Sequence, residues 1–361
     1  MDYRDFIGRP VQALPTPAML VEVAVLEQNI KLLADYFSGR PCKLRPHFKS
    51  HKCVTLAKRQ LKAGGAVGIT CAKLAEAEAL VSGGVKDVLV ANQVVGSDKA
   101  QRLAALNRSA TVRSAVDSEA NVLELGAAAQ AAGVTIGVLV EVDIGMRRCG
   151  VLPGEPAAAL AALVSSTRSL RLDGLQGYEG HLVMTPDAEE RRRKVLDALG
   201  PMVETRRLFE KSGLRCPILS GGGTGTYDIT GNVPGIDEVQ AGSYALMDCH
   251  YKKVRPEFQN AMSILATVIS VTGRKVVLDV GLKGMGSEFG LPVVAGVPEA
   301  KALYVAEEHC PVDDCPGRVG EKLRLIPSHG CTTSNLHRRL WVVRNTIVDD
   351  VWPIEGSGCL E

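Results

Sequence analysis

The strongest constraint on the fold is a regular alternation of short apolar runs with helical patterns. Eight strand-like runs follow one another, and a helix or a helix-length segment joins each to the next. They are Cys42–His47, Val67–Cys71, Asp87–Asn92, Thr111–Val116, Thr135–Val142, Leu172–Gly177, Cys216–Ser220 and Asp237–Ala241. Eight such units are the number that closes a parallel (β/α)8 barrel. We therefore predict an α/β fold with a TIM barrel as the N-terminal domain.

Helical periodicity between these runs supports the same fold. The helical runs include Cys53–Ala63, Leu74–Val81, Ser118–Ala132, Pro156–Ser165 and Ala188–Ser212. Glycines stand where the helices should end, at Gly64-Gly65, Gly83-Gly84, Gly133 and Gly213. An open, doubly wound sheet is the main alternative. The absence of a GxGxxG motif after a first strand counts against it.

The two ends of the chain do not fit the barrel count. The strand-like run Ala18–Val23 is one too many, and a helix of roughly Val25 to Phe37 follows it. After about Glu257, strand-like pieces alternate with turns and no long helical period intervenes. These pieces are Val268–Val271, Lys275–Val280, Leu323–Ile326 and Trp341–Arg344. We predict a barrel over residues 26–255 and an antiparallel β domain from residues 1–25 and 256–361.

Composition excludes several classes of protein. The 361 residues are 46% hydrophobic and 23% charged, which is enough apolar material for two domains. A net charge of +2 does not indicate binding to nucleic acid or to an anionic membrane. The polar start has no apolar signal region, and no apolar run approaches the ~20 residues of a spanning helix. Ten cysteines without CxxC pairs indicate reduced thiols, so we expect a cytoplasmic protein.

A short apolar run ends in a cluster of basic residues between Leu44 and Cys53. A lysine at the end of a strand, facing a pocket and crowded by other cations, loses its proton near neutral pH. Its neutral amine can then form a Schiff base. Lys49 is the candidate, and His47, His51 and Lys52 are the neighbours expected to keep it partly neutral. A basic loop in contact with solvent is the other interpretation of this stretch.

Functional side chains of a parallel barrel collect at the carboxyl ends of its strands. Lys49 follows the first predicted barrel strand, and Arg148 follows the fifth. Tyr178, Glu179 and His181 follow the sixth. The stretch 221–226 (GGGTGT) follows the seventh, and 242–244 (GSY) follows the eighth. We expect all of them to point into one mouth. Two of them also have structural interpretations: Arg148 could pair with Asp143, and Tyr178 could be simple packing.

The glycine-rich stretch 221–226 is suited to an anion. Glycines let backbone N–H groups approach phosphate oxygens, and the hydroxyls of Thr224 and Thr226 add donors. Its position after the seventh strand is that of the usual phosphate site of a barrel. A flexible turn is the alternative interpretation.

A second candidate site lies in the predicted β domain. His329 and Cys331 are two residues apart in the stretch 328–333, so both could bind one metal ion. Imidazole and thiolate together favour Zn²⁺ over hard cations, and only two ligands would leave positions open for water or substrate. An incidental pair is the alternative, and we interpret His309, Cys310 and Cys315 as mostly incidental too.

Taken together and in this order, these pieces resemble the fold-type III pyridoxal-phosphate (PLP) enzymes. The nearest branches are the D-threonine aldolases and the eukaryotic-type D-serine dehydratases, and the first domain resembles that of alanine racemases. The matching stretches are 16–18, 44–53, 141–150, 220–225, 240–244 with 247–248, 279–283, 327–329 through 335–337, and 350–354. They run through most of the chain, and as a set they are specific for the superfamily.

The resemblance implies a role for each matching residue. Lys49 would be the Schiff-base lysine, Arg148 would meet the phenolic oxygen of PLP, and Tyr178 would line its pocket. The phosphate would be held by Gly222, Gly223 and Thr224, with Tyr244 close by. His329 and Cys331 would hold a divalent metal, zinc or manganese. We take Lys49, His47 and His181 as the candidate catalytic residues. The family further implies that Ala18–Val23 joins the β domain and that the enzyme is a homodimer.

Two departures keep the reaction open. The aldolases carry Asp at the position of Cys331, whereas the D-serine dehydratases carry Cys and use zinc. The order Tyr178-Glu179-Gly180-His181 also differs from the aldolase pattern, which has His directly after Tyr. In contrast, the stretches 220–225 and 335–337 resemble the aldolases more closely.

We expect retro-aldol cleavage of a D-β-hydroxy amino acid such as D-threonine to glycine and an aldehyde. In both this reaction and its main alternative, the metal would act as a Lewis acid and PLP would absorb the carbanion. The alternative is a zinc-dependent dehydratase acting on D-serine or D-3-hydroxyaspartate, in which Lys49 removes the α-proton and a keto acid and ammonia form. A racemase is a third candidate, and a PLP-binding homeostasis protein is a non-enzymatic fourth. The region from Glu257 to Glu361 counts against the fourth, because such proteins have a single domain.

Overall fold

The computed structural model describes residues 2–361. The chain forms two compact units, and each is described by itself. The first, here called the β unit, comprises the described part of Met1–Leu33 together with Ser50–Leu56 and Ser243–Gly358. The second, here called the barrel unit, comprises Ala34–Lys49, Ala57–Gly242 and Cys359–Glu361.

Eight parallel strands form the barrel unit, as the sequence predicts. They are β2 (Lys43–Leu44), β3 (Ile69–Cys71), β4 (Asp87–Gln93), β5 (Thr111–Val116), β6 (Ile136–Glu141), β7 (Leu170–Gln176), β8 (Ile218–Gly221) and β9 (Glu238–Val239). They pair in the order β2-β9-β8-β7-β6-β5-β4-β3. Two isolated parallel bridges, Leu44 to Ala66 and His47 to Thr70, join the two ends of this order. The sheet therefore closes on itself as a barrel.

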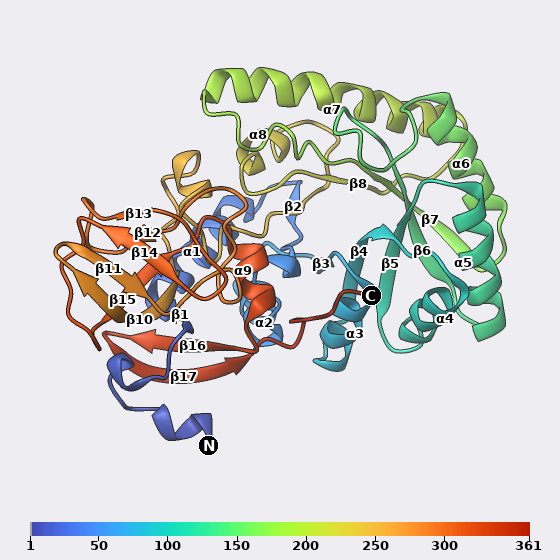
Figure 1. The fold of residues 1–361 in the computed structure, drawn as a ribbon. Coiled ribbons are helices and arrows are strands. Elements are labelled where there is room, and N and C mark those ends of the chain that lie inside the picture. Colours follow the sequence, from blue (N-terminus) through green and yellow to red (C-terminus); the bar gives the residue numbers. More distant parts are fainter. Residues whose placement is uncertain (1) are drawn as a thin grey trace. The chain divides into compact units, whose positions relative to one another are not determined.

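Helices follow the strands along the chain and cover the outside of the sheet (Figure 1). They are α2 (Val54–Lys62), α3 (Leu74–Ser82), α4 (Ser97–Leu106), α5 (Glu119–Ala132), α6 (Glu155–Ser166), α7 (Ala188–Lys211) and the single turn α8 (Tyr227–Thr230). The ends of α5 show why the pattern was readable. Ser118 caps it by accepting a hydrogen bond from the N–H of Asn121, and it stops at Gly133, whose φ of +66° favours glycine.

A buried network of ion pairs links the barrel strands. Arg45, 2% exposed, donates to both carboxylate oxygens of Glu238 at 2.8 and 2.6 Å and to Asp87 at 2.5 Å. Arg113 bridges Asp87 and Asp173, at 2.8 Å to each. Burial alone would raise the pKa of Asp87, but the two arginines outweigh burial and hold that pKa below its ordinary value. The arginines and acids of this network therefore each depend on the opposite charge of their partners.

The β unit is built on one mixed sheet. Its strands are β1 (Ala18–Glu22), β10 (Met262–Thr272), β11 (Lys275–Leu278), β12 (Val293–Val294), β13 (Lys301–Ala302), β14 (Cys310–Asp313), β15 (Lys322–Ile326), β16 (Arg339–Arg344) and β17 (Ile347–Pro353). The main order is β13-β14-β11-β10-β1-β16-β17, and β15 pairs with β10 and β12. The surplus N-terminal strand joins this sheet, as expected. The predicted antiparallel β domain is confirmed, and within it β1 and β16 pair in parallel.

Helices and turns complete the β unit. They are α1 (Val23–Phe37), which continues into the barrel unit, α9 (Gly330–Leu336), and the 3₁₀ turns η1 (Tyr3–Phe6), η2 (Val11–Ala13) and η4 (Tyr251–Lys253); a further turn, η3 (Phe48–Ser50), follows β2. A core cluster joins the start of the chain to the sheet, with Phe6 and Leu14 packed among Leu20, Leu265 and Trp341. The N-terminal segment is therefore anchored by apolar burial.

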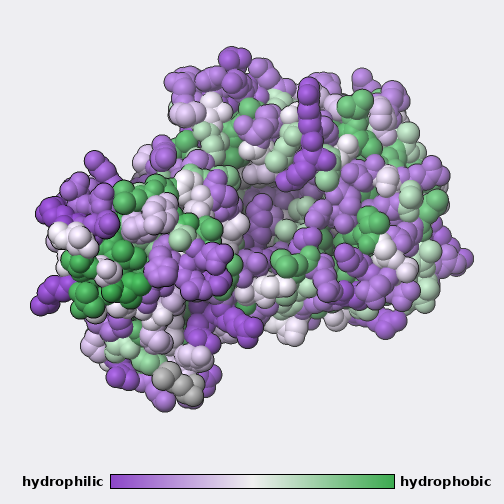
Figure 2. All heavy atoms as spheres, viewed as in Figure 1, coloured by the Kyte–Doolittle hydropathy of each residue, from purple (hydrophilic) through white to green (hydrophobic). Residues whose placement is uncertain are grey.

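Part of the β unit's surface is apolar. Hydrophobic residues gather over strands of the β unit on the face shown in Figure 2. Exposed large apolar side chains of this unit include Val293, Leu303, Tyr304 and Val319. No helix within residues 2–361 combines the length and apolar character needed to cross a bilayer. All ten cysteines are free thiols, as predicted.

The ion-pair network generates a stability prediction. Replacing Arg45→Met leaves Glu238 and Asp87 without their shared cation, so the free energy of unfolding should fall by about 3–5 kcal/mol. Urea unfolding measures it. A matched control is Arg193→Gln, because the Arg193 side chain is 65% exposed and pairs only on the surface of α7. The control should change the free energy of unfolding by less than about 0.5 kcal/mol.

The pH dependence of that difference has a defined sign. The folded-state pKa of Asp87 is depressed, so its stabilising contribution is complete above its unfolded value of 3.8. That contribution is lost as the pH falls through the lower, folded-state pKa. The gap between parent and Arg45→Met should therefore shrink in acid. A gap that widens in acid, or equal stabilities at neutral pH, would contradict the network's role.

Candidate functional site

The basic stretch that contains Lys49 is packed within the protein. Lys49 lies in the 3₁₀ turn η3, directly after β2, and is half-buried. Phe48 and His51 are 0% exposed, and His47 and Lys52 are 8% and 7% exposed. The backbone N–H of Lys49 donates to Nδ1 of His47 at 3.4 Å, which fixes the orientation of that ring. The alternative of a basic loop in contact with solvent is therefore wrong.

Three of the predicted cofactor-binding residues lie around the ring of a fourth, Tyr178. The Nζ of Lys49 lies 5.9 Å from the ring centroid, and the guanidinium carbon of Arg148 lies 5.7 Å from it. A Cβ placed on Gly223 would stand 3.3 Å from Cε2 of Tyr178, so the ring packs directly on that glycine. These residues follow β2, β6, β7 and β8, whose carboxyl ends share one edge of a parallel sheet. The barrel topology brings them together.

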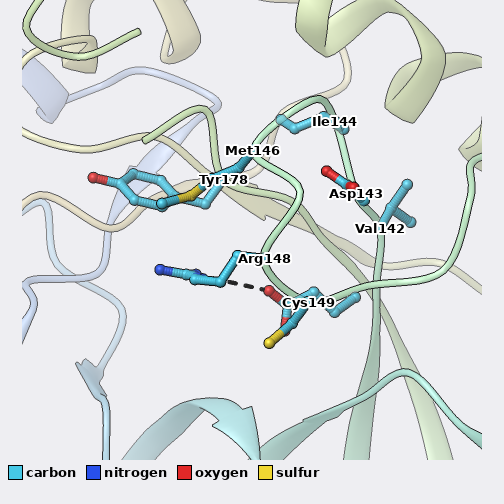
Figure 3. A pocket seen from close by; sticks show the side chains of 8 residues that line it. Val142, Asp143, Ile144, Met146, Arg148, Cys149 and Tyr178 are labelled. Atoms are coloured by element: carbon cyan, nitrogen blue, oxygen red, sulfur yellow. Dashed lines mark ion pairs between the residues drawn. The ribbon is translucent and has the colours of Figure 1, made fainter. Parts of the chain in front are cut away.

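Arg148 forms an ion pair with a buried acid. Its Nη2 lies 3.9 Å from Oε1 of Glu141 (Figure 3). Gln93 donates to the other carboxylate oxygen of Glu141 at 2.6 Å. Burial raises the pKa of Glu141, against the opposing effects of Gln93 and Arg148. Arg148 itself is 48% exposed, so its guanidinium can meet an anionic oxygen from outside. Pairing with buried Glu141 on one side and exposure to solvent on the other suit Arg148 to bind a ligand while it stays in place.

A small pocket surrounds this pair, and one loop shapes it. Its lining residues are Glu141, Val142, Asp143, Ile144, Met146, Arg148, Cys149 and Tyr178. Oδ1 of Asp143 accepts hydrogen bonds from the backbone N–H groups of Gly145 and Arg147, at 2.9 and 3.0 Å. Backbone donors to Asp143 also lower the pKa of its carboxyl. Asp143 thus folds the loop that presents Arg148, and Arg148 forms its ion pair with Glu141.

The glycine-rich turn after β8 requires its glycines. A Cβ on Gly225 would stand 2.0 Å from the carbonyl oxygen of Val183, and Gly222 has a φ of +72°. The N–H of Gly222 donates to Oε2 of Glu179 at 3.1 Å, and the N–H of Gly223 donates to the hydroxyl of Thr226 at 3.2 Å. Two of the expected phosphate donors are therefore engaged within the protein.

The predicted metal ligands lie in the β unit, at the start of α9. His329 is the residue just before α9, at its N-cap position, and its side chain makes no capping hydrogen bond. Its Nδ1 is hydrogen-bonded to Oε1 of Glu288, which also accepts from the hydroxyl of Thr332 at 2.6 Å. Burial would lower the pKa of His329, but Cys331 and Glu288 outweigh it and raise that pKa to about 9. A carboxylate on Nδ1 leaves Nε2 as the atom that can bind a metal. The donor set fits an open, two-ligand site.

Neighbouring groups support this site without enlarging it. Asp248 is 1% exposed, and its Oδ2 accepts from the N–H of Gly330 at 3.0 Å, which fixes the start of α9. Burial raises the pKa of Asp248. Within residues 2–361 no group of three or more His, Cys, Asp and Glu side chains is arranged to hold a metal ion. A metal here would thus depend on His329, Cys331 and ligands from outside the chain.

The remaining predicted residues occupy different surroundings. His181 is exposed, and its Nε2 would stand 3.3 Å from a Cβ on Gly145, so it borders the loop that carries Arg148. Tyr244 belongs to the β unit, is 0% exposed and has its ring centroid 5.8 Å from that of Phe258. His47 is buried and lies two residues before Lys49 in the chain.

Sequence reasoning missed the supporting roles of four acids, including Glu179, which it expected to point into the barrel mouth. The roles of Glu141, Glu179, Asp248 and Glu288 depend on partners far along the chain. For Glu141 and Glu179 a signal exists, because each is an acid at or just after the end of an apolar strand. Glu288 lies in a turn region 41 residues before its partner His329, and no pattern marks it.

Comparison with known proteins places the chain in a family. Residues 21–249 match the family model described as "Alanine racemase, N-terminal domain", and residues 261–343 match "Putative serine dehydratase domain". A 3-hydroxy-D-aspartate aldolase from Paracoccus denitrificans (strain Pd 1222) is 37% identical, over 98% of this chain and 96% of the relative. A D-threonine aldolase from an Arthrobacter species is also 37% identical, over 97% and 95% of the two chains.

A solved structure shows the same architecture. The crystal structure of D-threonine aldolase from Filomicrobium marinum superposes with a TM-score of 0.96 at 36% identity, covering 98% of this chain and 99% of that one. The matches extend over both units. The chain therefore belongs to the alanine racemase-like, fold-type III family of PLP enzymes, among relatives of the D-threonine and 3-hydroxy-D-aspartate aldolases that carry a D-serine dehydratase-type C-terminal domain.

Proposed function

We propose that this protein is a PLP- and divalent-metal-dependent aldolase that cleaves D-β-hydroxy amino acids to glycine and an aldehyde. The observation that carries the proposal is the convergence of Lys49, Arg148 and Gly223 on the ring of Tyr178. An amine, a cation and a glycine turn around one aromatic ring are what an aldehyde-bearing, anionic, aromatic ligand requires. Full-length relatives named as D-threonine and 3-hydroxy-D-aspartate aldolases support the same reaction.

Each residue around Tyr178 would bind a different part of the cofactor. Lys49 would hold PLP covalently through Nζ, and Arg148, kept in place by Glu141, would face its phenolic oxygen. The turn of Gly222, Gly223 and Thr224 would approach the phosphate closely because two of its residues lack a Cβ. Bound there, PLP supplies the electron sink that accepts the charge left at Cα when a bond to it breaks.

Proton transfer falls to side chains of the chain itself. Cleavage of the Cα–Cβ bond requires a base that removes the proton from the β-hydroxyl oxygen. His181, at the edge of the Arg148 loop, and His47, beside Lys49, are the candidates for this base. His329 Nε2 and the Cys331 sulfur would hold zinc or manganese, which supplies Lewis acidity toward the β-hydroxyl.

Dehydration to a keto acid and ammonia is the second candidate, and one residue favours it. Cys331 stands where the aldolases of the resembling family carry Asp and the D-serine dehydratases carry Cys. In that reaction Lys49 would take the proton from Cα, whereas the aldolase reaction needs a base at the β-hydroxyl instead. The carboxyl-terminal match to a serine dehydratase domain is compatible with either reaction.

We propose in addition that the enzyme is a homodimer, as the family resemblance implies. Exposed apolar side chains of the β unit, among them Val293, Leu303 and Tyr304, supply surface that a second copy could cover. Sedimentation of the purified protein tests this assembly directly.

Product analysis separates the two reactions. Protein loaded with PLP and Zn²⁺ or Mn²⁺ is incubated with D-threonine, D-phenylserine, 3-hydroxy-D-aspartate and D-serine. We expect glycine and the matching aldehyde from the first three and little turnover of D-serine, which would yield formaldehyde. A keto acid with ammonia as the main product would establish the dehydratase instead. Interconversion of D- and L-enantiomers without cleavage would indicate a racemase.

The metal assignment predicts a graded loss of Zn²⁺ binding. Removing the imidazole in His329→Ala should abolish tight binding, because only one protein ligand would remain. Glu288→Gln keeps the ligand but weakens its fixed orientation, so Zn²⁺ affinity should fall by about 10–100-fold. Isothermal titration of the cofactor-free protein with Zn²⁺ measures both effects.

A matched control accompanies that series. Glu307→Gln removes an acid that is 83% exposed in the same unit, and it should leave Zn²⁺ affinity unchanged. Unaltered Zn²⁺ binding in His329→Ala would contradict the proposed metal site, as would full turnover in the presence of a chelator.

A further inference from the structure

Glu179 is a buried acid that the proposed reaction does not use. It follows Tyr178 directly, and its side chain is 0% exposed. Oε2 accepts the N–H of Gly222 at 3.1 Å. Oε1 accepts the hydroxyls of Thr226 at 2.8 Å and Thr230 at 2.5 Å. A carboxylate accepts hydrogen bonds and donates none, so these three donors, two from the stretch 221–226 and one from the end of α8, suit both its oxygens.

A second chain of hydrogen bonds links Glu179 to Gly223, the next residue of the turn. The N–H of Gly223 donates a hydrogen bond to the hydroxyl oxygen of Thr226 at 3.2 Å. The same hydroxyl donates its own hydrogen bond to Oε1 of Glu179. Thr226 and Thr230 are both 0% exposed. The N–H group of Gly222 is therefore hydrogen-bonded to the carboxylate of Glu179 directly, and that of Gly223 is linked to it through the hydroxyl of Thr226.

Tyr178 and Glu179 hold the turn by different means. The ring of Tyr178 packs on Gly223, while the carboxylate of Glu179 fixes the left-handed conformation of Gly222 through its N–H. A turn with five glycines or threonines in sequence would otherwise be free to adopt several conformations, which costs entropy on binding. Hydrogen bonds to a buried charged acceptor are among the stronger ones available to select one conformation.

We propose that Glu179 is the positioning residue of the phosphate-binding turn. It commits the N–H groups of Gly222 and Gly223 to the protein, and it thereby fixes the shape of the turn that would receive the phosphate. This inference rests on the proposed function, because it presumes that the turn receives the phosphate of PLP. Glu179 touches neither ligand nor reacting atoms in this role and is not a catalytic residue.

The test separates the phosphate from the rest of the cofactor. Cofactor-free protein is titrated calorimetrically with PLP and with pyridoxal, which lacks the phosphate, and the ratio of the two Kd values is compared among variants. In Glu179→Gln the amide cannot accept all three donors, so the turn loses its fixed shape. We expect the Kd for PLP to rise by about tenfold or more while the Kd for pyridoxal changes less than about twofold.

Thr226 supplies an independent pair of variants. Thr226→Val removes the hydroxyl that joins Gly223 to Glu179, and Thr226→Ser retains it. The valine variant should lose PLP affinity selectively, and the serine variant should behave like the parent. Glu189→Gln, at an exposed position in the first turn of α7, is the matched acid control and should change neither Kd. Melting temperatures without ligand show whether each variant is folded.

The outcomes discriminate among the explanations. If Glu179→Gln binds PLP as tightly as the parent, or more tightly because a negative charge near the phosphate has gone, the positioning role is refuted. Equal weakening of PLP and pyridoxal would show only a structural effect and would also refute it. If Glu179→Gln does not fold, the Thr226 pair decides. A parent protein that binds neither PLP nor pyridoxal would instead overturn the proposed function, and this inference with it.

Discussion

The rest of the structure depends on the parallel register of neighbouring barrel strands. Glu141 of β6 pairs with Gln176 of β7, and Gln176 pairs with Ser220 of β8. These three residues therefore stand at one level, and whatever follows each of them emerges at the same edge. Arg148, Tyr178 and Gly223 come from the segments that follow. A slip of register in any pair would separate the cation, the ring and the glycine turn.

Acidic side chains inside the protein then fix the groups that this register delivers. Glu141 forms an ion pair with Arg148, and Glu179 accepts a hydrogen bond from the turn that contains Gly223. In the β unit, Glu288 orients the ring of His329 and Asp248 anchors the N–H of Gly330. Glu179, Asp248 and Glu288 accept hydrogen bonds from the segments they hold, whereas Glu141 accepts one from Gln93 of β4 and forms an ion pair with Arg148. These contacts give the segments defined shapes before any ligand binds. This is preorganisation by buried charge, and it lowers the entropy that binding must overcome.

The fold could be predicted from the sequence because its signals are local. The eight strands and the glycine stops depend on patterns within about 15 residues, and the structure confirms them. The parallel pairing of β1 with β16 joins residues more than 300 positions apart, so no local pattern could reveal it. Lys49 could be chosen as a candidate because a strand end and a basic cluster coincide, whereas Glu288 contacts His329 only through tertiary structure. The reaction stays harder to predict than the fold, since Cys331 and the glycine turn favour different branches of one family.

The most direct test of this account is the chemical state of Lys49. The PLP-loaded protein is reduced with borohydride, digested, and examined by mass spectrometry for a pyridoxyl-lysine. We predict that the label is on Lys49 and that Lys52, buried three residues later, stays unlabelled. A label confined to any other lysine, or no label after reduction, would contradict the proposal that Lys49 holds the cofactor beside Tyr178.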